Sequence, residues 1–483
     1  MLDYWETLTQ NKVIASPFGL YNELYRPQFH FTARENWLND PNGLVYYDGE
    51  YHLFFQHNPN GNEWGKMSWG HAVSTDLVHW KQIENALEPD RMGAVFSGSA
   101  VVDWRNTAGF EVGDEPAMVA IYTAAGDAGP ESAGLPYAQC LAFSNDRGRT
   151  WEKYSENPVV PHIIGWNRDP KVTWYEPGGY WVMVLYLDED TFAILRSKDL
   201  KCWKRTQTLS IPGARECPDL YEIAVEGTPG ETRWILAGAN GLYYIGTFNG
   251  KLFEAEEGPY AMTQGENFYG IQTFSDIPVL DGRRIQIAWM AGGMYPGMPF
   301  NQQMSFPCEL RLHRVPEGLR LFINPIREID TLYSATHEYR DIVLTPWNNP
   351  LPDYPGSLYD VLAEFEYDPD SVLTFNIHGH EVRYACRTKM LSCGHTVEVE
   401  PVDGKVRLRM LVDRTSIEIF ANDGRVLLNY CMVPSEYGVH VSSGSSTVRI
   451  NLLSIHELRS SWTQSSANQL DERLEGSPNN PVK

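Results

Sequence analysis

The segment from Ser74 to Trp80 reads Ser-Thr-Asp-Leu-Val-His-Trp, and its pattern of a serine, an aspartate and a later tryptophan recurs twice further along the chain. The other copies run from Ser144 to Trp151 and from Ser197 to Trp203. Each copy lies between two strand-like runs, so its aspartate is expected to hydrogen-bond backbone amides in a turn while its tryptophan packs between sheets. Repeats about fifty to seventy residues apart, each long enough for four short strands, are typical of β-propeller blades.

Strand-like sequence surrounds these repeats. Residues 43–55, GLVYYDGEYHLFF, form two alternating runs around Asp48-Gly49, which is a strong signal for a β-hairpin. Runs of the same kind recur at 118–124, 181–188, 192–197, 233–239 and 284–291. Because helical periodicity is scarce, the sequence predicts an all-β protein that begins with a five-bladed β-propeller.

The texture of the sequence changes after residue 326. A stretch interrupted by prolines comes first, and long alternating runs with a turn at Asp403-Gly404 follow it, which indicates a β-sandwich. We therefore expect a five-bladed propeller followed by a C-terminal β-sandwich. The expected parts are an N-terminal extension over 1–28, the propeller over 29–335, a linker over 336–358, the sandwich over 359–460 and a polar tail over 461–483.

Composition narrows the classes of function. Hydrophobic residues make up 42% of the chain and charged residues 21%, so a folded core is expected. A formal net charge of -23 repels phosphates and anionic surfaces, which argues against nucleic acid as a partner. No run approaches the roughly 18 apolar residues of a membrane span. The oligomeric state is left open.

The cysteines and the N-terminal sequence indicate in which cellular compartment the protein is expected. The seven cysteines are scattered without a C-x-x-C pair, so we expect free thiols and no zinc site. The start, MLDYWETLTQNK, lacks a basic region followed by an apolar one, so we expect no signal peptide in this chain. These features favour the cytoplasm, with a secreted mature form as the alternative.

Three carboxylates stand next to prolines at blade-like separations. Asp40 lies in WLNDPNG, Asp169 in WNRDP and Glu216 in RECPD. The neighbouring proline is expected to hold each acid in extended geometry, so that it points in one direction. Any one of these acids taken alone suits a turn or a cap. Three in similar contexts suggest a site at the mouth of the propeller channel, where each blade contributes from its innermost strand.

Longer motifs support this site. The strings WLNDPNG, FFQHNP, WGHAVSTDLVHW, FSGSAVV, NRDPKV, ECPDLYE and FYGIQTFSD occur in this order, and VDRTSIEIFANDG follows near the C-terminus. The series resembles that of glycoside hydrolase family 32, which contains the invertases, inulinases and levanases that cleave β-fructofuranosides. The resemblance covers nearly the whole chain and implies a propeller with a sandwich behind it.

The resemblance also implies an activity and roles. Asp40 would be the nucleophile, Glu216 the acid and then the base, and Asp169 the group that holds ring hydroxyls. The implied enzyme is a retaining exo-β-fructofuranosidase that acts on sucrose, inulin or levan without a cofactor. We expect Asn39 and backbone donors to keep the pKa of Asp40 low.

The same resemblance implies a set of residues that bind the sugar. Trp37, Trp64, Phe96 and Trp289 would wall the fructose, and Asn39, Gln56 and Ser97 would bond its hydroxyls. Each aromatic residue has core packing as its alternative. Arg168 either favours the charged carboxylates or binds substrate. The histidines at 57, 71 and 79 lack metal-ligand spacing and are interpreted as structural.

Other functions remain open at this stage. A fructosyltransferase would use the same three acids with a sugar as acceptor, and a non-catalytic carbohydrate-binding propeller would keep only the repeats. The segment from Ser144 to Trp151 also matches a turn found in sialidase propellers, yet a sialidase needs an arginine cluster for the substrate carboxylate and a tyrosine nucleophile. In the sandwich, Asp413, Arg414, Glu418 and Phe420 are expected to be structural, since alternation along the strand places them on opposite faces.

Overall fold

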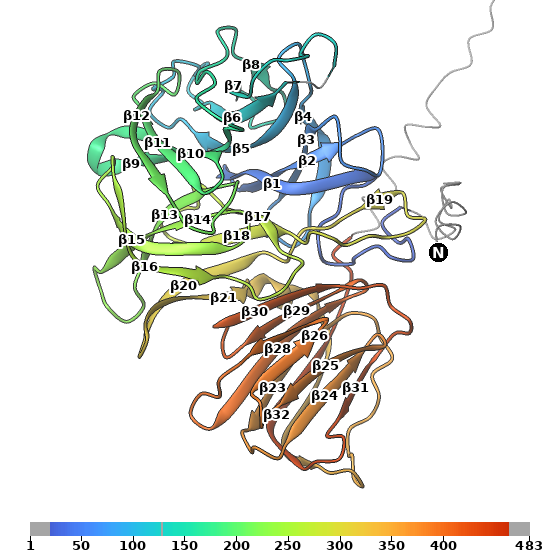
Figure 1. Cartoon of the computed structure of the whole chain (residues 1–483). Helices are drawn as coiled ribbons and strands as arrows, with labels where there is room; N and C mark the ends of the chain where they lie inside the picture. Colours follow the sequence, from blue (N-terminus) through green and yellow to red (C-terminus); the bar gives the residue numbers. More distant parts are fainter. Residues whose placement is uncertain (1–19, 127–128, 463–483) are drawn as a thin grey trace, which may run out of the picture.

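The computed structural model describes residues 20–126 and 129–462 of the 483-residue chain. A propeller of five sheets lies above a two-sheet sandwich (Figure 1). Within the described residues the helical segments are two short 3₁₀ turns, Glu176–Gly178 and Arg327–Leu332. The prediction of an all-β propeller with a C-terminal sandwich is confirmed. Most of the predicted polar tail and of the N-terminal extension lies outside the described residues.

The first three blades follow one another along the chain. The first consists of β1 (Asn36–Tyr47), β2 (Glu50–Asn58), β3 (Ser68–Ser74) and β4 (Lys81–Leu87), with β19 (Phe300–Asn301) added parallel to β1. The second consists of β5 (Ala94–Val102), β6 (Met118–Ala125), β7 (Ala138–Ser144) and β8 (Glu152–Lys153). The third consists of β9 (Arg168–Tyr175), β10 (Tyr180–Asp188), β11 (Thr191–Ser197) and β12 (Lys204–Ser210).

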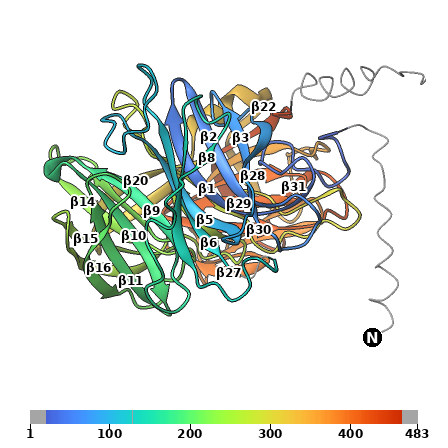
Figure 2. The ribbon, with the colours of Figure 1, turned by 90° about the horizontal axis from the view of Figure 1, so that it is seen from above.

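Two further blades complete the propeller. The fourth consists of β13 (Asp219–Ala224), β14 (Thr232–Ala237), β15 (Leu242–Phe248) and β16 (Phe253–Ala261). The fifth consists of β17 (Tyr269–Thr273), β18 (Arg284–Trp289), β20 (Cys308–Val315) and β21 (Gly318–Pro325). The innermost strands β1, β5, β9, β13 and β17 contact one another in a ring, and the view from above shows β1, β5 and β9 in succession (Figure 2). The ring places the starts of five strands around one channel mouth.

The repeated serine, aspartate and tryptophan motif forms the turn between the third and fourth strands of a blade. Asp76 accepts hydrogen bonds from the backbone N–H groups of Val78 and His79, and Trp80 Nε1 donates to Leu77 O. The other two copies make the equivalent bonds. The predicted turn role of the motif is confirmed. In the fourth blade Asn249 takes the place of the aspartate and accepts hydrogen bonds from the backbone N–H groups of Lys251 and Leu252. Because this copy has an asparagine, it does not match the sequence motif.

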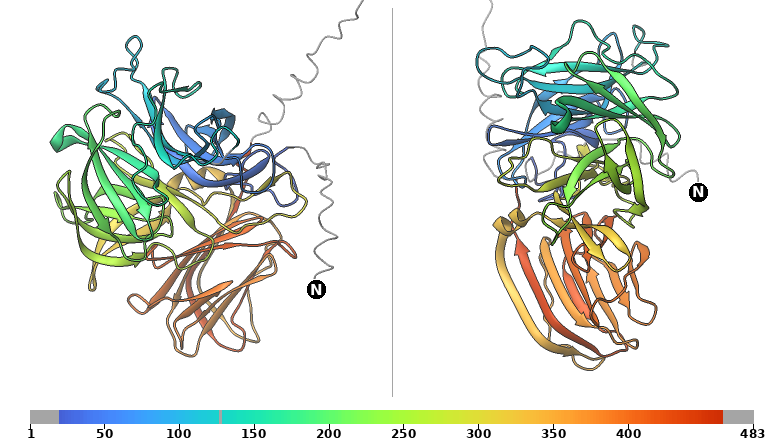
Figure 3. Two further views of the ribbon diagram at one scale, coloured as in Figure 1. Left: turned by 45° about the horizontal axis from the view of Figure 1, so that its top comes forward. Right: turned by 90° about the vertical axis from the view of Figure 1, so that its left-hand side faces the viewer.

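The sandwich consists of two antiparallel sheets that face each other (Figure 3). One sheet contains β22 (Tyr333–Leu344), β32 (Val448–Leu458), β23 (Tyr359–Glu366), β28 (Lys405–Asp413), β29 (Ser416–Ala421) and β30 (Val426–Cys431). The other contains β27 (His395–Glu398), β26 (Met390–Cys393), β25 (His380–Ala385), β24 (Val372–Ile377) and β31 (Val439–Ser442). Between them the rings of Phe365 and Tyr384 meet edge to face, 5.6 Å apart.

One predicted domain boundary is wrong. β22 begins in the predicted propeller and runs through the first part of the predicted linker, 336–358, yet it pairs along its length with β32 of the sandwich. β22 is an edge strand with mostly exposed side chains, so its sequence carries little hydrophobic alternation. The other predicted boundaries stay predictions.

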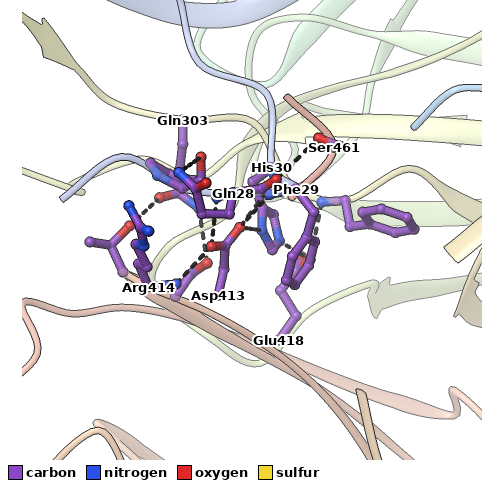
Figure 4. A network of polar contacts seen from close by, with 12 residues as sticks. Gln28, Phe29, His30, Gln303, Asp413, Arg414, Glu418 and Ser461 are labelled. Atoms are coloured by element: carbon purple, nitrogen blue, oxygen red, sulfur yellow. Dashed lines mark hydrogen bonds and ion pairs between the residues drawn. The ribbon is translucent and has the colours of Figure 1, made fainter. Parts of the chain in front are cut away.

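A buried polar network joins the propeller to the sandwich (Figure 4). The carboxylate of Asp413 accepts hydrogen bonds from the backbone N–H groups of Gln28, Phe29 and His30. The imidazole of His30 lies between Asp413, at 2.9 Å, and Glu418, at 2.8 Å. Glu418 also accepts a hydrogen bond from the backbone N–H of Phe306 in the propeller. These acids lie at the interface between the domains, and the predicted structural role fits their contacts.

The charge of His30 should make the stability of the protein depend on pH. Burial by itself lowers the pKa of His30, but the hydrogen bonds to Asp413 and Glu418 outweigh it and raise the pKa from 6.5 to about 9. A histidine that holds its proton more tightly in the folded state stabilises the fold fully below pH 6.5, and this contribution is lost as the pH rises through about 9. Urea midpoints should therefore fall between pH 6.5 and 9.5 in the wild type and change less in His30→Gln. The exposed control His162→Gln should follow the wild type, and parallel profiles for His30→Gln and wild type would refute this origin.

Candidate active site

A pocket of about 440 Å³ opens where the innermost strands begin. Asp40, Ser97, Asp169 and Tyr269 lie in the first halves of the innermost strands β1, β5, β9 and β17, and Glu216 lies just before β13. All five blades therefore contribute to one pocket. Asp40, Asp169 and Glu216, the three acids singled out in the sequence, all line this pocket.

Breaks in strand register coincide with the pocket. β1 shifts register against β2 between Leu38 and Pro41, and β5 shifts against β6 between Val95 and Gly98. β9 and β17 have the same kind of break at their starts. A bulge releases one or two residues from pairing and redirects their side chains. The bulges therefore turn the pocket residues out of the regular alternation of the blade.

The backbone conformation of two of the acids differs from the predicted extended geometry. Asp169 has a φ of +64°, and Glu216 and Cys217 have φ values of +44° and +32°. The prediction that the neighbouring proline holds these acids in extended geometry is therefore wrong for Asp169 and Glu216. Non-glycine residues in this region carry strain that the surrounding structure must support, and such residues gather at functional sites.

Asp40 is closely surrounded. Its Oδ2 accepts a hydrogen bond of 2.8 Å from Ser97 Oγ, and Cys217 Sγ lies 3.5 Å from the same atom. Gly270 has a φ of +61°, and a Cβ there would lie 2.6 Å from Asp40 Oδ1, so only glycine leaves room for the carboxylate. Burial raises the pKa of Asp40, against the hydrogen bonds of Ser97 and Asn39 that lower it. The expectation of a low pKa is wrong because burial does not show in the local sequence.

Arg168 connects the other two acids. Its Nη2 donates to Glu216 Oε1 at 2.5 Å, and its Nε lies 3.6 Å from Asp169 Oδ2. Burial raises the pKa of Asp169 to about 7, with the guanidinium of Arg168 opposing the rise and the charge of Asp40 adding to it. Glu216 Oε2 accepts a second hydrogen bond, 2.8 Å long, from the hydroxyl of Tyr269. Of the two roles left open for Arg168, pairing with the carboxylates is the one that its contacts support.

A buried ion pair lies beneath the acids. Lys171 lies two residues after Asp169 on β9, and Asp219 is the first residue of β13, three residues after Glu216. Lys171 Nζ lies 3.5 Å from Asp219 Oδ1. Both groups also bind the backbone of Thr273 on β17. Lys171 Nζ donates to the carbonyl of Thr273, and the N–H of Thr273 donates to Asp219 Oδ2, each at 2.6 Å. The pair therefore fixes the spacing of the three strands from which Asp169, Glu216 and Tyr269 reach the pocket.

The structure places the predicted sugar-binding residues around the acids, with one exception. Those that line the pocket are Asn39, Gln56, Trp64, Phe96, Ser97, Arg168 and Trp289. Trp37 does not line it. Its indole N–H donates to Asn39 Oδ1 at 2.9 Å, and its ring packs edge to face on Trp289, so it supports two residues that do. Trp37 belongs to the same motif as Asp40. Membership of a motif does not show whether a residue lines the pocket or only packs behind residues that do.

Three lining residues were missed from the sequence: Tyr137, Trp166 and Tyr269. Trp166 stands in the WNRDP motif of Asp169, and Tyr269 stands in FYGIQTFSD, one of the motifs that carry the family resemblance. Tyr137 lies in a loop with no such signal. Together with Trp64 and Phe96, Tyr137 and Trp166 form a chain of edge-to-face rings along one side of the mouth, with centroids 5.4 to 5.8 Å apart.

The histidines singled out in the sequence have structural contacts. His57 bonds the carbonyl of Trp37, His79 bonds Asp76, and His71 bonds His52 within the first blade. In the part of the chain that the structure describes, no three His, Cys, Asp or Glu side chains are grouped so as to hold a metal ion. No helix there has the length and apolar character that crossing a membrane requires.

Comparison with known protein families identifies the family of this chain. The model for the glycosyl hydrolases family 32 N-terminal domain matches residues 30–325, and the model for the family's C-terminal domain matches residues 379–457. The chain belongs to glycoside hydrolase family 32.

Individual relatives agree with this placement. A levanase of Bacillus subtilis (strain 168) is 38% identical, over 93% of this chain and 72% of its own length. An extracellular exo-inulinase of Aspergillus ficuum is 30% identical, over 93% of this chain and 97% of its own length. The crystal structure of an exo-inulinase from Aspergillus awamori superposes with a TM-score of 0.82 at 26% identity and covers 92% of this chain and 100% of that one.

Breaking the ion pair beneath the acids should destabilise the fold. Lys171→Met leaves the buried Asp219 carboxylate without its cation, which typically costs about 3 to 5 kcal/mol. The double variant Lys171→Met/Asp219→Asn removes both charges and keeps an acceptor for the Thr273 N–H, so it should recover much of this loss. Urea unfolding of the wild type, both single variants and the double variant measures the coupling. Additive losses would mean that the two side chains do not act as a pair.

Proposed function

We propose that this chain is a retaining, exo-acting β-fructofuranosidase that releases terminal fructose from sucrose and from fructans. The observation that carries the proposal is the group of three acids in one pocket, with Arg168 bridging Asp169 and Glu216. The names of the relatives, levanase, exo-inulinase and invertase, support fructosyl substrates.

Asp40 and Glu216 divide the chemistry of the first step. Asp40 attacks the anomeric carbon of the fructosyl unit as the bond to the leaving oxygen breaks, and Glu216 gives that oxygen a proton. The product is a fructosyl ester on Asp40. The hydrogen bond from Ser97 and the glycine at 270 hold the carboxylate of Asp40 in place for this attack.

Water completes the reaction in the second step. Glu216 takes a proton from the water as its oxygen attacks the anomeric carbon, and the bond to Asp40 breaks. Net retention follows from two displacements. Tyr269 and Arg168 hold the carboxyl group of Glu216 at its two oxygens, so it stays positioned for both proton transfers.

The remaining residues bind the sugar. Asp169 faces the pocket and offers hydrogen-bond acceptors to ring hydroxyls. Gln56 is oriented by its Nε2, which donates to Asn42 Oδ1 at 2.7 Å and to Val95 O at 3.1 Å, so its carbonyl oxygen is the part left for substrate. Trp289 and Phe96 supply flat apolar walls. A pocket of about 440 Å³ at a channel mouth suits a chain end, which supports exo action.

An activated substrate should separate the roles of Asp40 and Glu216. Asp40→Asn removes the attacking group and should abolish turnover on every substrate. Glu216→Gln removes proton transfer, a contribution of roughly 10² to 10⁴ in rate on sucrose. A fructoside whose leaving group needs no proton should be attacked by Glu216→Gln at a rate much nearer the wild type, with the intermediate accumulating. Burst kinetics measure this. Equal losses on sucrose and on the activated fructoside would show that Glu216 is not the acid.

Exo action predicts the first products from a polymer. A pocket that accepts only a chain end should release free fructose from inulin, without intermediate oligomers at low conversion. Chromatography of early digests checks this. A ladder of oligomers would contradict exo action, and a rise of larger saccharides from sucrose alone would indicate transfer to a sugar in place of hydrolysis.

A further inference from the structure

A second hollow adjoins the catalytic pocket, and Trp64 lines both. It encloses about 930 Å³ between residues 58–66, which connect β2 to β3, and residues 294–301, which lead into β19. The side chain of Trp64 is 59% exposed between the two spaces. We call this hollow the Trp64 groove. The mechanism proposed above uses no residue of this groove, although Trp37, which supports Asn39 and Trp289, also lines it.

The Trp64 groove is held in shape by bonds between its two walls. Asn62 Nδ2 donates to the carbonyl of Met298 at 2.9 Å, and Asn301 Nδ2 donates to the carbonyl of Asn62 at 3.1 Å. The N–H of Trp37 donates to the carbonyl of Gly61 at 3.0 Å, which ties the first wall to β1. A ligand entering this groove does not have to order the loops, so little of its binding energy is lost to ordering them.

The lining of the groove suits a neutral, polyhydroxylated ligand. The charged residues of the lining are Glu35, Glu63 and Lys66, so both signs are present and no strong charge of one sign builds up. Asn60 adds an exposed amide. Sugar hydroxyls both donate and accept, so they match amides, and the face of an indole packs against a sugar ring.

We propose that the Trp64 groove holds the sugar units of a fructan chain that follow the terminal fructose bound in the pocket. This inference rests on the proposed function. A polymer bound by its end must leave the pocket on one side, and Trp64 continues from the pocket into the groove. Trp166 stands at the other end of the row of rings that begins at Trp64, is 60% exposed, and offers the competing route.

Kinetics on sucrose and inulin test the groove. Met294 is 67% exposed in its wall, so Met294→Trp narrows the groove at a surface position and does not touch the acids. We expect kcat/KM on inulin to fall by roughly fivefold to tenfold, mainly through KM, with sucrose unchanged within about twofold. Val279→Trp, at an exposed loop residue outside the groove, is the matched control and should change neither.

The outcomes separate this inference from the proposed function. An unchanged ratio of inulin to sucrose activity in Met294→Trp would overturn the proposal that the groove binds the fructan chain. It would leave the assignment of the enzyme unaffected. A selective loss on inulin in Trp166→Ala, with none in Met294→Trp, would place the fructan chain at the Trp166 end of the row of rings and would also overturn the inference. A wild-type protein that cleaves neither substrate would overturn the proposed function itself.

Discussion

Three carboxyl groups share one small pocket, and the cost of holding them there away from water governs the structure around them. Two like charges about 4 Å apart repel by about 4 kcal/mol at an effective dielectric constant of 20. Burial adds to this cost and raises the pKa of Asp40 and of Asp169. Arg168, Ser97 and Tyr269 offset it with a bridging guanidinium and two hydroxyl donors. The pocket is thus built of donors directed at carboxylates, and the same donors position those carboxylates for a sugar.

Directing the acids into one pocket also costs conformational strain in the backbone. Regular strands alternate their side chains, so a ring of innermost strands alone would not direct neighbouring residues such as Arg168 and Asp169 into one space. The bulges at the strand starts and the positive φ angles of Asp169 and Glu216 do so at the expense of local strain. The ion pair of Lys171 and Asp219, one layer below, holds the strands against that strain. This explains why the motifs NRDPKV and ECPDL extend past their acids.

The fold and the acids were predictable from sequence because both are recorded in local patterns. Strand alternation, the repeated turn motif and the three acids beside prolines depend on residues close in the chain. Features that depend on residues far apart were not predictable. The pairing of β22 with β32, the burial that raises the pKa of Asp40, and the role of Trp37 behind Asn39 arise only when distant strands meet. The wrong inference about extended acids has the same origin, since tertiary packing overrode the preference of a residue that precedes proline.

A short segment of the propeller, residues 302–306, connects the sandwich to the pocket. Gln302 Oε1 accepts a hydrogen bond of 3.1 Å from the indole N–H of Trp289, which lines the pocket. The next residue, Gln303, donates to Ser416 Oγ of the sandwich at 3.0 Å, and Phe306 donates its N–H to Glu418. Phe306 also belongs to an apolar cluster that includes side chains of both domains. Because one segment is held by the sandwich on one side and holds a pocket wall on the other, the position of Trp289 depends on how the sandwich is docked. The second domain is therefore part of the support of the pocket, although none of its residues lines it.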